Sequence, residues 1–173
     1  DETVLATNAS ANFADNFSNT PVPGADGQAS ITSAYALSIT GGNGTDSGLD
    51  NLAGQNILLY NNAGTIEGRV GDTVYFTVSV NGSGTVTLDQ QIAIKHPNTA
   101  NPDDAVTLSN ANLVVLTRTD TITDGDGDTA TGSNSINIGQ ALSFEDDGPS
   151  ITVNVTAAAD ALTVDETVLA TNA

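Results

Sequence analysis

The stretch Val-Tyr-Phe-Thr-Val-Ser-Val at residues 74–80 decides the fold class of this chain of 173 residues. Its apolar residues recur at every second position. Because successive side chains of a β-strand point to opposite faces, one face of the stretch is apolar while Thr77 and Ser79 lie opposite. Asn81-Gly82 follows at once, a pair that favours the left-handed backbone of a tight hairpin turn. The stretch therefore predicts a half-buried strand that ends in a turn.

The same two-residue period recurs along the rest of the chain. The Gly-rich segment 41–49 is interpreted as a loop, although it nearly matches a Ca²⁺-binding nonapeptide of β-rolls, and the Ala-rich segment 157–162 favours a helical turn. Short strands bounded by Gly, Asn and Asp predict an all-β fold, namely an immunoglobulin-like antiparallel β-sandwich with long Gly/Asp-rich loops. The further strands are expected at 31–39, 56–60, 65–70, 85–94, 112–122, 133–138 and 150–155.

The chain is strongly acidic, with 21 Asp and Glu residues against 3 Lys and Arg, a net charge of −18. Binding to nucleic acid or to an anionic membrane surface needs clustered basic residues, so we expect neither partner, and no apolar run is long enough for membrane insertion. Cysteine is absent, which excludes disulfides. Bound metal is the alternative restraint on the loops of an acidic chain.

A nine-residue repeat joins the two ends of the sequence. Residues 1–9 and 165–173 both read Asp-Glu-Thr-Val-Leu-Ala-Thr-Asn-Ala, an offset of 164 residues. Either tandem copies of one module or a chain extended to overlap its own start would produce this identity, and we favour tandem copies. The expected organisation is a single sandwich module at 1–164, with 165–173 beginning the next copy.

Two short motifs concentrate the carboxylates. Asp124-Gly125-Asp126-Gly127-Asp128 can aim several oxygens at one centre, which suits Ca²⁺, and a solvated acidic hairpin turn is the alternative. An EF-hand is excluded because its twelfth position, Ser135, is not Glu. Glu145-Asp146-Asp147 precedes Gly148-Pro149, so a metal-clamped turn is expected there.

A third acidic set lies where one copy meets the next. It could bind Ca²⁺ between modules or form an ordinary polar linker, and its members are Asp1, Glu2, Asp160, Asp165 and Glu166. The single histidine, His96, is interpreted as a structural turn residue. Arg69 and Arg118 are expected to pair with nearby carboxylates.

Taken in order, these motifs resemble a known family. Gly24-Ala25-Asp26-Gly27, the loop at 44–49, the Asp124–Asp128 run and Phe144–Pro149 are similar to the tandem extender repeat, roughly 143 residues long, of giant bacterial RTX adhesins exported by type I secretion. The resemblance covers about residues 10–155. It implies calcium-binding immunoglobulin-like modules on the surface of a Gram-negative bacterium, and it adds Asp26 to the expected Ca²⁺ ligands.

The expected function is therefore a non-catalytic extender module. Ca²⁺ would stiffen it, its partners would be neighbouring identical modules of the same chain, and the module itself would be monomeric and extracellular. The alternative is a ligand-binding module for carbohydrate or ice, since Thr117, Thr119, Thr121 and Thr123 alternate along one strand. An enzyme is not expected, because the chain has no Trp and its single His lacks a Ser or Cys constellation.

Overall fold

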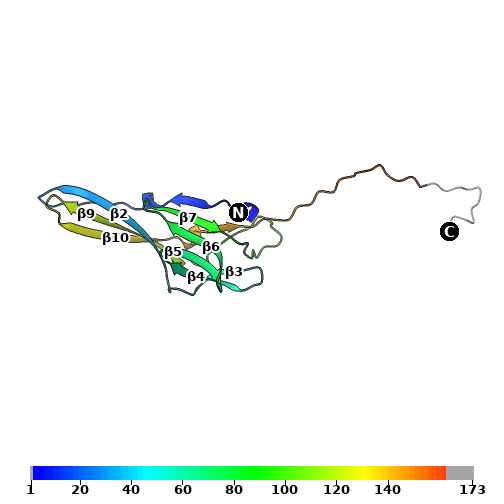
Figure 1. Ribbon diagram of the computed structural model, residues 1–173, viewed down its shortest axis with the longest axis horizontal. Helices are drawn as coiled ribbons and strands as arrows, with labels where there is room; N and C mark the ends of the chain where they lie inside the picture. The colour runs from blue at the N-terminus through cyan, green and yellow to red at the C-terminus, as the bar shows by residue number, and fades with distance from the viewer. Residues whose placement is uncertain (1, 163–173) are drawn as a thin grey trace, which may run out of the picture.

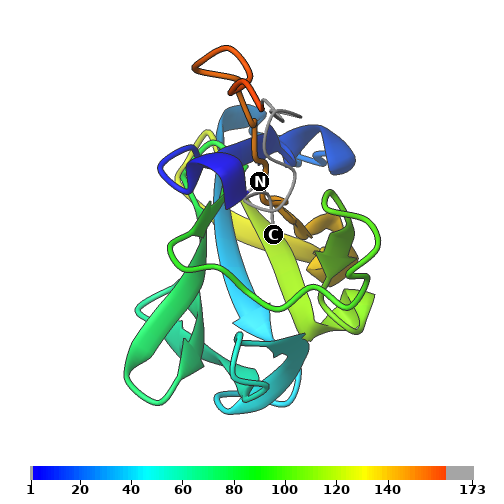
Figure 2. The same ribbon diagram turned by 90° about the vertical axis from the view of Figure 1, so that its right-hand side faces the viewer.

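The computed structural model describes residues 2–162, which form a curled β-sandwich built from antiparallel strands (Figures 1 and 2). One layer is a six-stranded sheet in the order β1-β7-β6-β5-β4-β3, and the other consists of the sheet β10-β9-β2 and the pair β11-β8. The strands are β1 (Ala9–Asn12), β2 (Gln28–Ile39), β3 (Thr45–Asp50), β4 (Asn56–Asn62), β5 (Thr65–Val70), β6 (Thr73–Val80), β7 (Thr85–Gln90), β8 (Ala105–Thr107), β9 (Val114–Asp124), β10 (Thr129–Asn137) and β11 (Ser143–Glu145).

Short 3-10 helices connect some of the strands. They are η1 (Glu2–Val4), η2 (Ala14–Asn16), η3 (Ala111–Leu113) and η4 (Gly139–Ala141). Among residues 2–162, no helix is long and apolar enough to cross a membrane.

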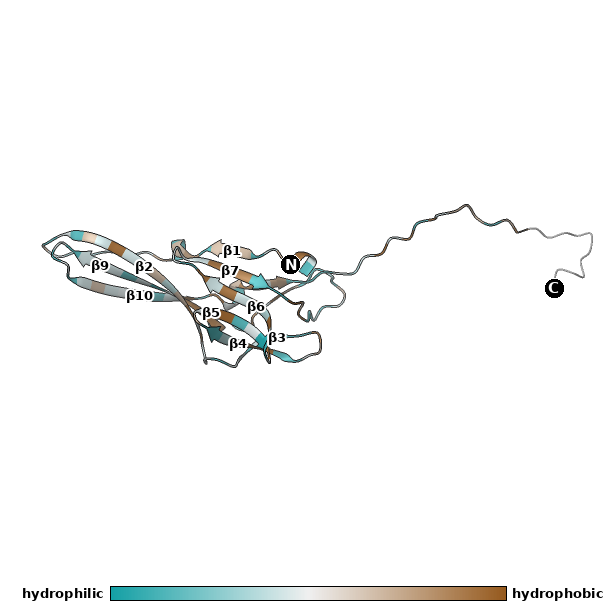
Figure 3. Ribbon diagram, in the orientation of Figure 1, coloured by the Kyte–Doolittle hydropathy of each residue, from teal (hydrophilic) through white to brown (hydrophobic). Residues whose placement is uncertain are grey.

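The core fills the space between the two layers. Phe76 of β6 and Phe144 of β11 meet there with ring centroids 4.9 Å apart, and both are fully buried. Figure 3 shows hydrophobic and hydrophilic residues alternating along the strands, as the two-residue period requires. Gly68 pairs with Phe76 across β5 and β6 and leaves room for the ring. Aliphatic residues complete the core: Leu37, Leu49, Ile57, Leu59, Ile66, Val78, Val86, Ile94, Leu108, Val114, Leu116, Ile138 and Leu142.

The predicted all-β sandwich is confirmed, but several strands differ from the expected ones. β1, β8 and β11 were not expected, and β9 and β10 have different bounds. Residues 45–50 of the segment interpreted as a loop form β3, and the strand expected at 85–94 ends at Gln90. Residues 150–155 form no strand and residues 157–162 no helical turn. A period-two pattern favours an extended chain, but a strand also needs a neighbouring backbone to pair with. The segment 150–155 has none among the described residues.

The three-stranded sheet extends beyond the six-stranded one along the long axis of the molecule. Its β9-β10 turn lies at one end, whereas the blue η1 and the chain that leaves β11 lie at the other (Figure 1). The side chains of β10 are almost all exposed. The molecule therefore has a solvent-exposed tip, formed by β2, β9 and β10, and a broader base.

Candidate metal centres

Three carboxylates meet at the tip, where β9 turns into β10. Asp124 ends β9, Asp126 lies in the turn and Asp26 precedes β2. Each offers an oxygen, and these oxygens all lie within 4.8 Å of one another. The register explains the meeting, because Gln28 pairs with Asp124 and the loop before β2 therefore reaches the turn after β9. The structure brings together three of the ligands expected from the sequence.

The turn itself is shaped by Asp124. Its Oδ1 accepts hydrogen bonds from the backbone nitrogens of Gly127 (3.2 Å) and Asp128 (2.9 Å). Gly125 passes so close to Asp26 that a Cβ would lie 2.5 Å from the Asp26 carbonyl oxygen. The Asp128 carboxylate is not part of the three-oxygen group. The glycines thus let two loops touch, and the structure separates Asp128 from the ligands it was grouped with.

No basic side chain neutralises the tip among residues 2–162. Arg69 pairs with Glu67 and Arg118 with Asp120, which confirms the expectation that the scarce arginines pair with carboxylates. Three carboxylates without a cation repel one another, and hard oxygen donors at this spacing match what Ca²⁺ selects. The tip fits Ca²⁺ by its donor set.

A second cluster, the Glu2 cluster, lies at the base and consists of Glu2, His96, Asp104 and Asp146. Glu2 comes from η1, His96 from the loop after β7, Asp104 from just before β8 and Asp146 from just after β11. The pairing of Glu145 with Ala105 places Asp146 beside Asp104, and the Asp146 backbone nitrogen donates to the Asp104 carbonyl at 3.0 Å. One donor atom each of Glu2, His96 and Asp146 lies within 4.8 Å of the others.

The His96 imidazole is the centre of this cluster. Its side chain is only 3% exposed, its Nε2 lies 3.5 Å from Glu2 Oε1, and its Nδ1 lies 3.7 Å from Asp104 Oδ1. Neither ring nitrogen has a hydrogen-bond partner among the described residues, and neither has Asp104 Oδ1. Buried polar atoms are normally satisfied, so this group of open donors and acceptors indicates a missing partner.

The spacing suits a bound cation. Two donors each about 2.1 Å from one tetrahedral ion lie roughly 3.4 Å apart, close to the Nε2–Oε1 separation. Asp104 lies against the other ring nitrogen, where a carboxylate commonly orients a ligating histidine. Glu2 Oε1 is held by the side chain of Gln90 and by the Ile94 backbone nitrogen, both at 2.8 Å. The carboxylates suit Ca²⁺, and the imidazole suits transition metals such as Zn²⁺.

Sequence reasoning placed Glu2 and Asp146 among the candidate ligands but missed His96 and Asp104. His96 lies in the loop after β7 and not in a turn, and its ring faces three carboxylates. The signal available in the sequence was its position as the single histidine of an acidic chain, with Asp103-Asp104 just before a strand. Only the folding of the base shows that these residues meet.

The remaining candidate ligands lie apart from both clusters. Glu145 and Asp147 flank Asp146 but are exposed, because neighbouring residues of an extended chain point in different directions. Asp160 is exposed on the segment after the sandwich. Asp1, Asp165 and Glu166 lie outside the described residues, as does the repeated segment 165–173.

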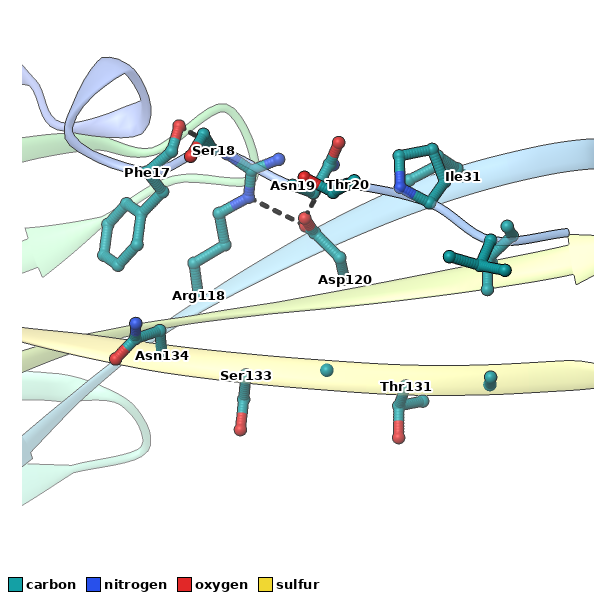
Figure 4. Close-up of a pocket in the computed structure, with 15 residues that line it drawn as sticks. Phe17, Ser18, Asn19, Thr20, Ile31, Arg118, Asp120, Thr131, Ser133 and Asn134 are labelled. Carbon is teal, nitrogen blue, oxygen red and sulfur yellow. Dashed lines mark hydrogen bonds and ion pairs between the residues drawn. The ribbon is translucent and has the colours of Figure 1, made fainter.

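A third feature is a cavity of about 450 Å³ between the segment at residues 17–22 and the sheet β10-β9-β2 (Figure 4). Arg118 Nε donates to Asp120 Oδ1 at 2.7 Å, Ser33 Oγ donates to the same oxygen at 2.6 Å, and Asn19 Nδ2 donates to Asp120 Oδ2 at 2.8 Å. These bonds, the one from Arg118 first, lower the pKa of Asp120 to about 2. Arg118 and Asp120 neutralise each other's charge. Because Asp120 also binds Asn19 and Arg118 also binds the Phe17 carbonyl, the pair holds the segment 17–22 against β9.

Comparison with known proteins gives a family but no characterised relative. No curated protein and no solved structure matches the chain at a significant level. Residues 1–139 match the family described as "Domain of unknown function (DUF5801)". The match covers the N-terminal segment, both edges of the six-stranded sheet and the Asp124–Asp128 turn. The chain is therefore a member of this domain family.

Proposed function

We propose that the chain is a Ca²⁺-rigidified extender module, one of a row of tandem copies in a large secreted bacterial surface adhesin. The observation that carries the proposal is the position of the two clusters. The tip cluster, which consists of Asp26, Asp124 and Asp126, lies at the turn between β9 and β10. The Glu2 cluster lies where the chain leaves β11, at the opposite end of the elongated sandwich (Figure 1). Cations bound there would stiffen the ends of each module, which are the places where a row of copies would otherwise bend.

Electrostatics gives the mechanism. A net charge of −18 makes the apo chain repel itself, and the repulsion is greatest where carboxylates meet. At the tip, Asp26, Asp124 and Asp126 would hold Ca²⁺ and tie the loop before β2 to the turn after β9. At the base, Glu2 and Asp146 would hold a cation and tie the start of the chain to its exit from β11. Binding only to the folded state also stabilises that state.

The place of action follows from the same chemistry. Extracellular modules bind Ca²⁺ with Kd of roughly 10⁻⁴–10⁻³ M, so such sites fill outside a cell and stay empty in the cytosol. The resemblance to RTX adhesin extenders and the repeat of residues 1–9 at 165–173 support an extracellular row of copies. We propose a mechanical role for both clusters.

A two-copy chain tests the proposal. Because residues 165–173 repeat residues 1–9, appending residues 10–173 creates a second copy without a foreign junction. Small-angle scattering and thermal unfolding should give a longer maximum dimension and a higher Tm in Ca²⁺ than in EDTA. The double variant Asp124→Asn, Asp126→Asn should lose a large part of both effects.

The matched control is Asp15→Asn, Asp72→Asn, which removes two exposed carboxylates away from the clusters. It should keep the full Ca²⁺ response. If Ca²⁺ changes neither dimension nor Tm of the unmodified two-copy chain, or if both double variants respond alike, the calcium-stiffened module is refuted.

One observation favours a second candidate, a ligand-binding module. The outer face of the sheet β10-β9-β2 carries hydroxyl or methyl side chains in register: Thr117 lies between Ala36 and Ser135, and Thr121 between Thr32 and Thr131. Such a flat, regular array could bind carbohydrate or ice. Binding to a glycan array or to ice that is lost in Thr121→Lys, and kept in Asp124→Asn, would support this candidate over the extender.

A further inference from the structure

The base of the sandwich has an open groove of about 620 Å³. It lies between the inner face of β1 and β7 and the segment at residues 141–145, and its apolar lining includes Val4, Ala9, Ala11, Leu88 and Leu142. β1 is the last strand of the six-stranded sheet and β11 belongs to a two-stranded pair, so one backbone edge of each strand is unpaired among the described residues. The groove therefore offers both an apolar surface and two strand edges.

The chain carries a segment with the complementary pattern. Ile151, Val153 and Val155 are 90%, 87% and 92% exposed, and Thr152 and Asn154 alternate with them. This segment extends away from the sandwich without a strand partner (Figure 1). Three aliphatic side chains at every second position are typical of a strand with one buried face, and here that face is in water.

We infer that residues 151–156 of one copy fill the groove of the next copy as an added strand between β1 and β11. The inference rests on the tandem arrangement of the proposed function. Ile151, Val153 and Val155 would face the apolar lining, while Thr152 and Asn154 would face solvent. The added strand would join the six-stranded sheet to the pair β11-β8 and close the open side of the sandwich, as donated strands do in other proteins.

The path of the chain supports the next copy as the acceptor. Ala9 recurs at position 173, and the length of chain between 156 and 173 is ample for a reversal, since hairpin loops need only two to five residues. Residue 2 and the exit from β11 lie at the same end of the molecule (Figure 1), with Glu2 close to Asp146.

The same copy is a poor acceptor. Gly148 rests on Pro102, so close that a Cβ on Gly148 would lie 2.1 Å from Pro102 Cβ. The Asp146 backbone nitrogen is bonded to the Asp104 carbonyl, which keeps the chain beside β8 as it leaves β11. Both contacts hold the chain beside β8 as far as Gly148, and residues 149–156 then extend away from the groove of their own copy (Figure 1).

Hydrogen exchange of the two-copy chain tests the inference. The peptide covering 150–157 occurs once in each copy. We expect two mass envelopes of equal size, one exchanging freely and one slowed by roughly a hundredfold, because only the first copy has a following groove to fill. The single-copy chain should give the fast envelope alone. One fast envelope in the two-copy chain, or one slow envelope for both copies, would overturn the inference.

Matched variants make the readout specific. Val153→Asp in the first copy should abolish the slow envelope, whereas Asn154→Asp, which adds the same charge on the outward face, should keep it. Equal loss in both variants would also overturn the inference. Exchange is measured in Ca²⁺ and in EDTA beside the scattering experiment. A slow envelope with no Ca²⁺-dependent length would refute only the calcium-stiffened extender, and a Ca²⁺-dependent length without a slow envelope would refute only the donated strand.

Discussion

The Arg118–Asp120 pair gives a quantitative prediction for Asp120→Asn. Three hydrogen bonds to the Asp120 carboxylate, that from Arg118 first, hold its pKa at about 2 against an ordinary 3.8. The side chain is 17% exposed, so solvent screens the pair only partly. Since each pKa unit corresponds to about 1.4 kcal/mol, the ionised carboxylate stabilises the fold by about 2 kcal/mol. We expect Asp120→Asn to lower the free energy of unfolding by about this amount at pH 6.

The pH dependence carries the sharper test. A carboxylate with a lowered folded-state pKa stabilises the fold above its unfolded pKa, and this contribution is lost as pH falls through the folded value. The difference between the unmodified chain and Asp120→Asn should therefore be full at pH 6, begin to shrink below about pH 4 and become small near pH 2. Urea unfolding followed by circular dichroism in EDTA measures it, with Asp72→Asn as the charge control. A difference that stays constant from pH 6 to pH 2 would refute the assignment.

Three further predictions concern the core, one loop and the ionic response. A Cβ on Gly68 would lie 2.1 Å from Phe76, so Gly68→Ala should destabilise by about 1–3 kcal/mol in urea, whereas Gly132→Ala, with open space around it, should be neutral or slightly stabilising. Asn51 bonds Gln55, Ala53 and the Tyr75 hydroxyl, so Asn51→Ala should cost about 1–3 kcal/mol by the same assay. NaCl should raise the Tm of the apo chain by screening, and CaCl₂ at equal ionic strength should raise it further; equal effects would contradict specific binding.

The two-residue period predicted most of the longer strands of the six-stranded sheet, because these strands have one face in the core. β4 and β6 follow the apolar pattern closely, and β5, which pairs with both, lies between them in the sequence. β3 was not predicted because one of its buried positions holds a polar residue. Ser47 is fully buried, and its Oγ donates to the Ile57 carbonyl at 2.6 Å. Gly48 next to it has φ +80° under Ser109. A strand that bends at a glycine and buries a hydroxyl carries no periodic signal.

The candidate site was predictable only where its ligands are neighbours in sequence. Asp124 and Asp126 lie in one turn, so a local motif finds them. The Glu2 cluster is assembled from four separate segments, and no spacing connects Glu2 with His96 or Asp104. Burial of His96 among carboxylates is a property of how the base closes, which depends on the pairing of β8 with β11.

A donated strand could also join separate molecules, whereas the module is expected to be monomeric. The free energies of burial, ordering and linkage show why both can hold. Burying Ile151, Val153 and Val155 would gain about 1.5–3 kcal/mol each. Ordering the backbone of residues 151–156 costs about 1–2 kcal/mol per residue, which nearly cancels the gain from burial. The backbone hydrogen bonds to β1 and β11, about 0.5–1.5 kcal/mol each, then leave a net gain of several kcal/mol. Docking between separate molecules at micromolar concentration is then unfavourable. Between linked copies the effective concentration is in the millimolar range, and this favours the docked state by several further kcal/mol. The segment would thus stay free in a single copy and become a strand only within a row, so the row itself completes the fold of each module.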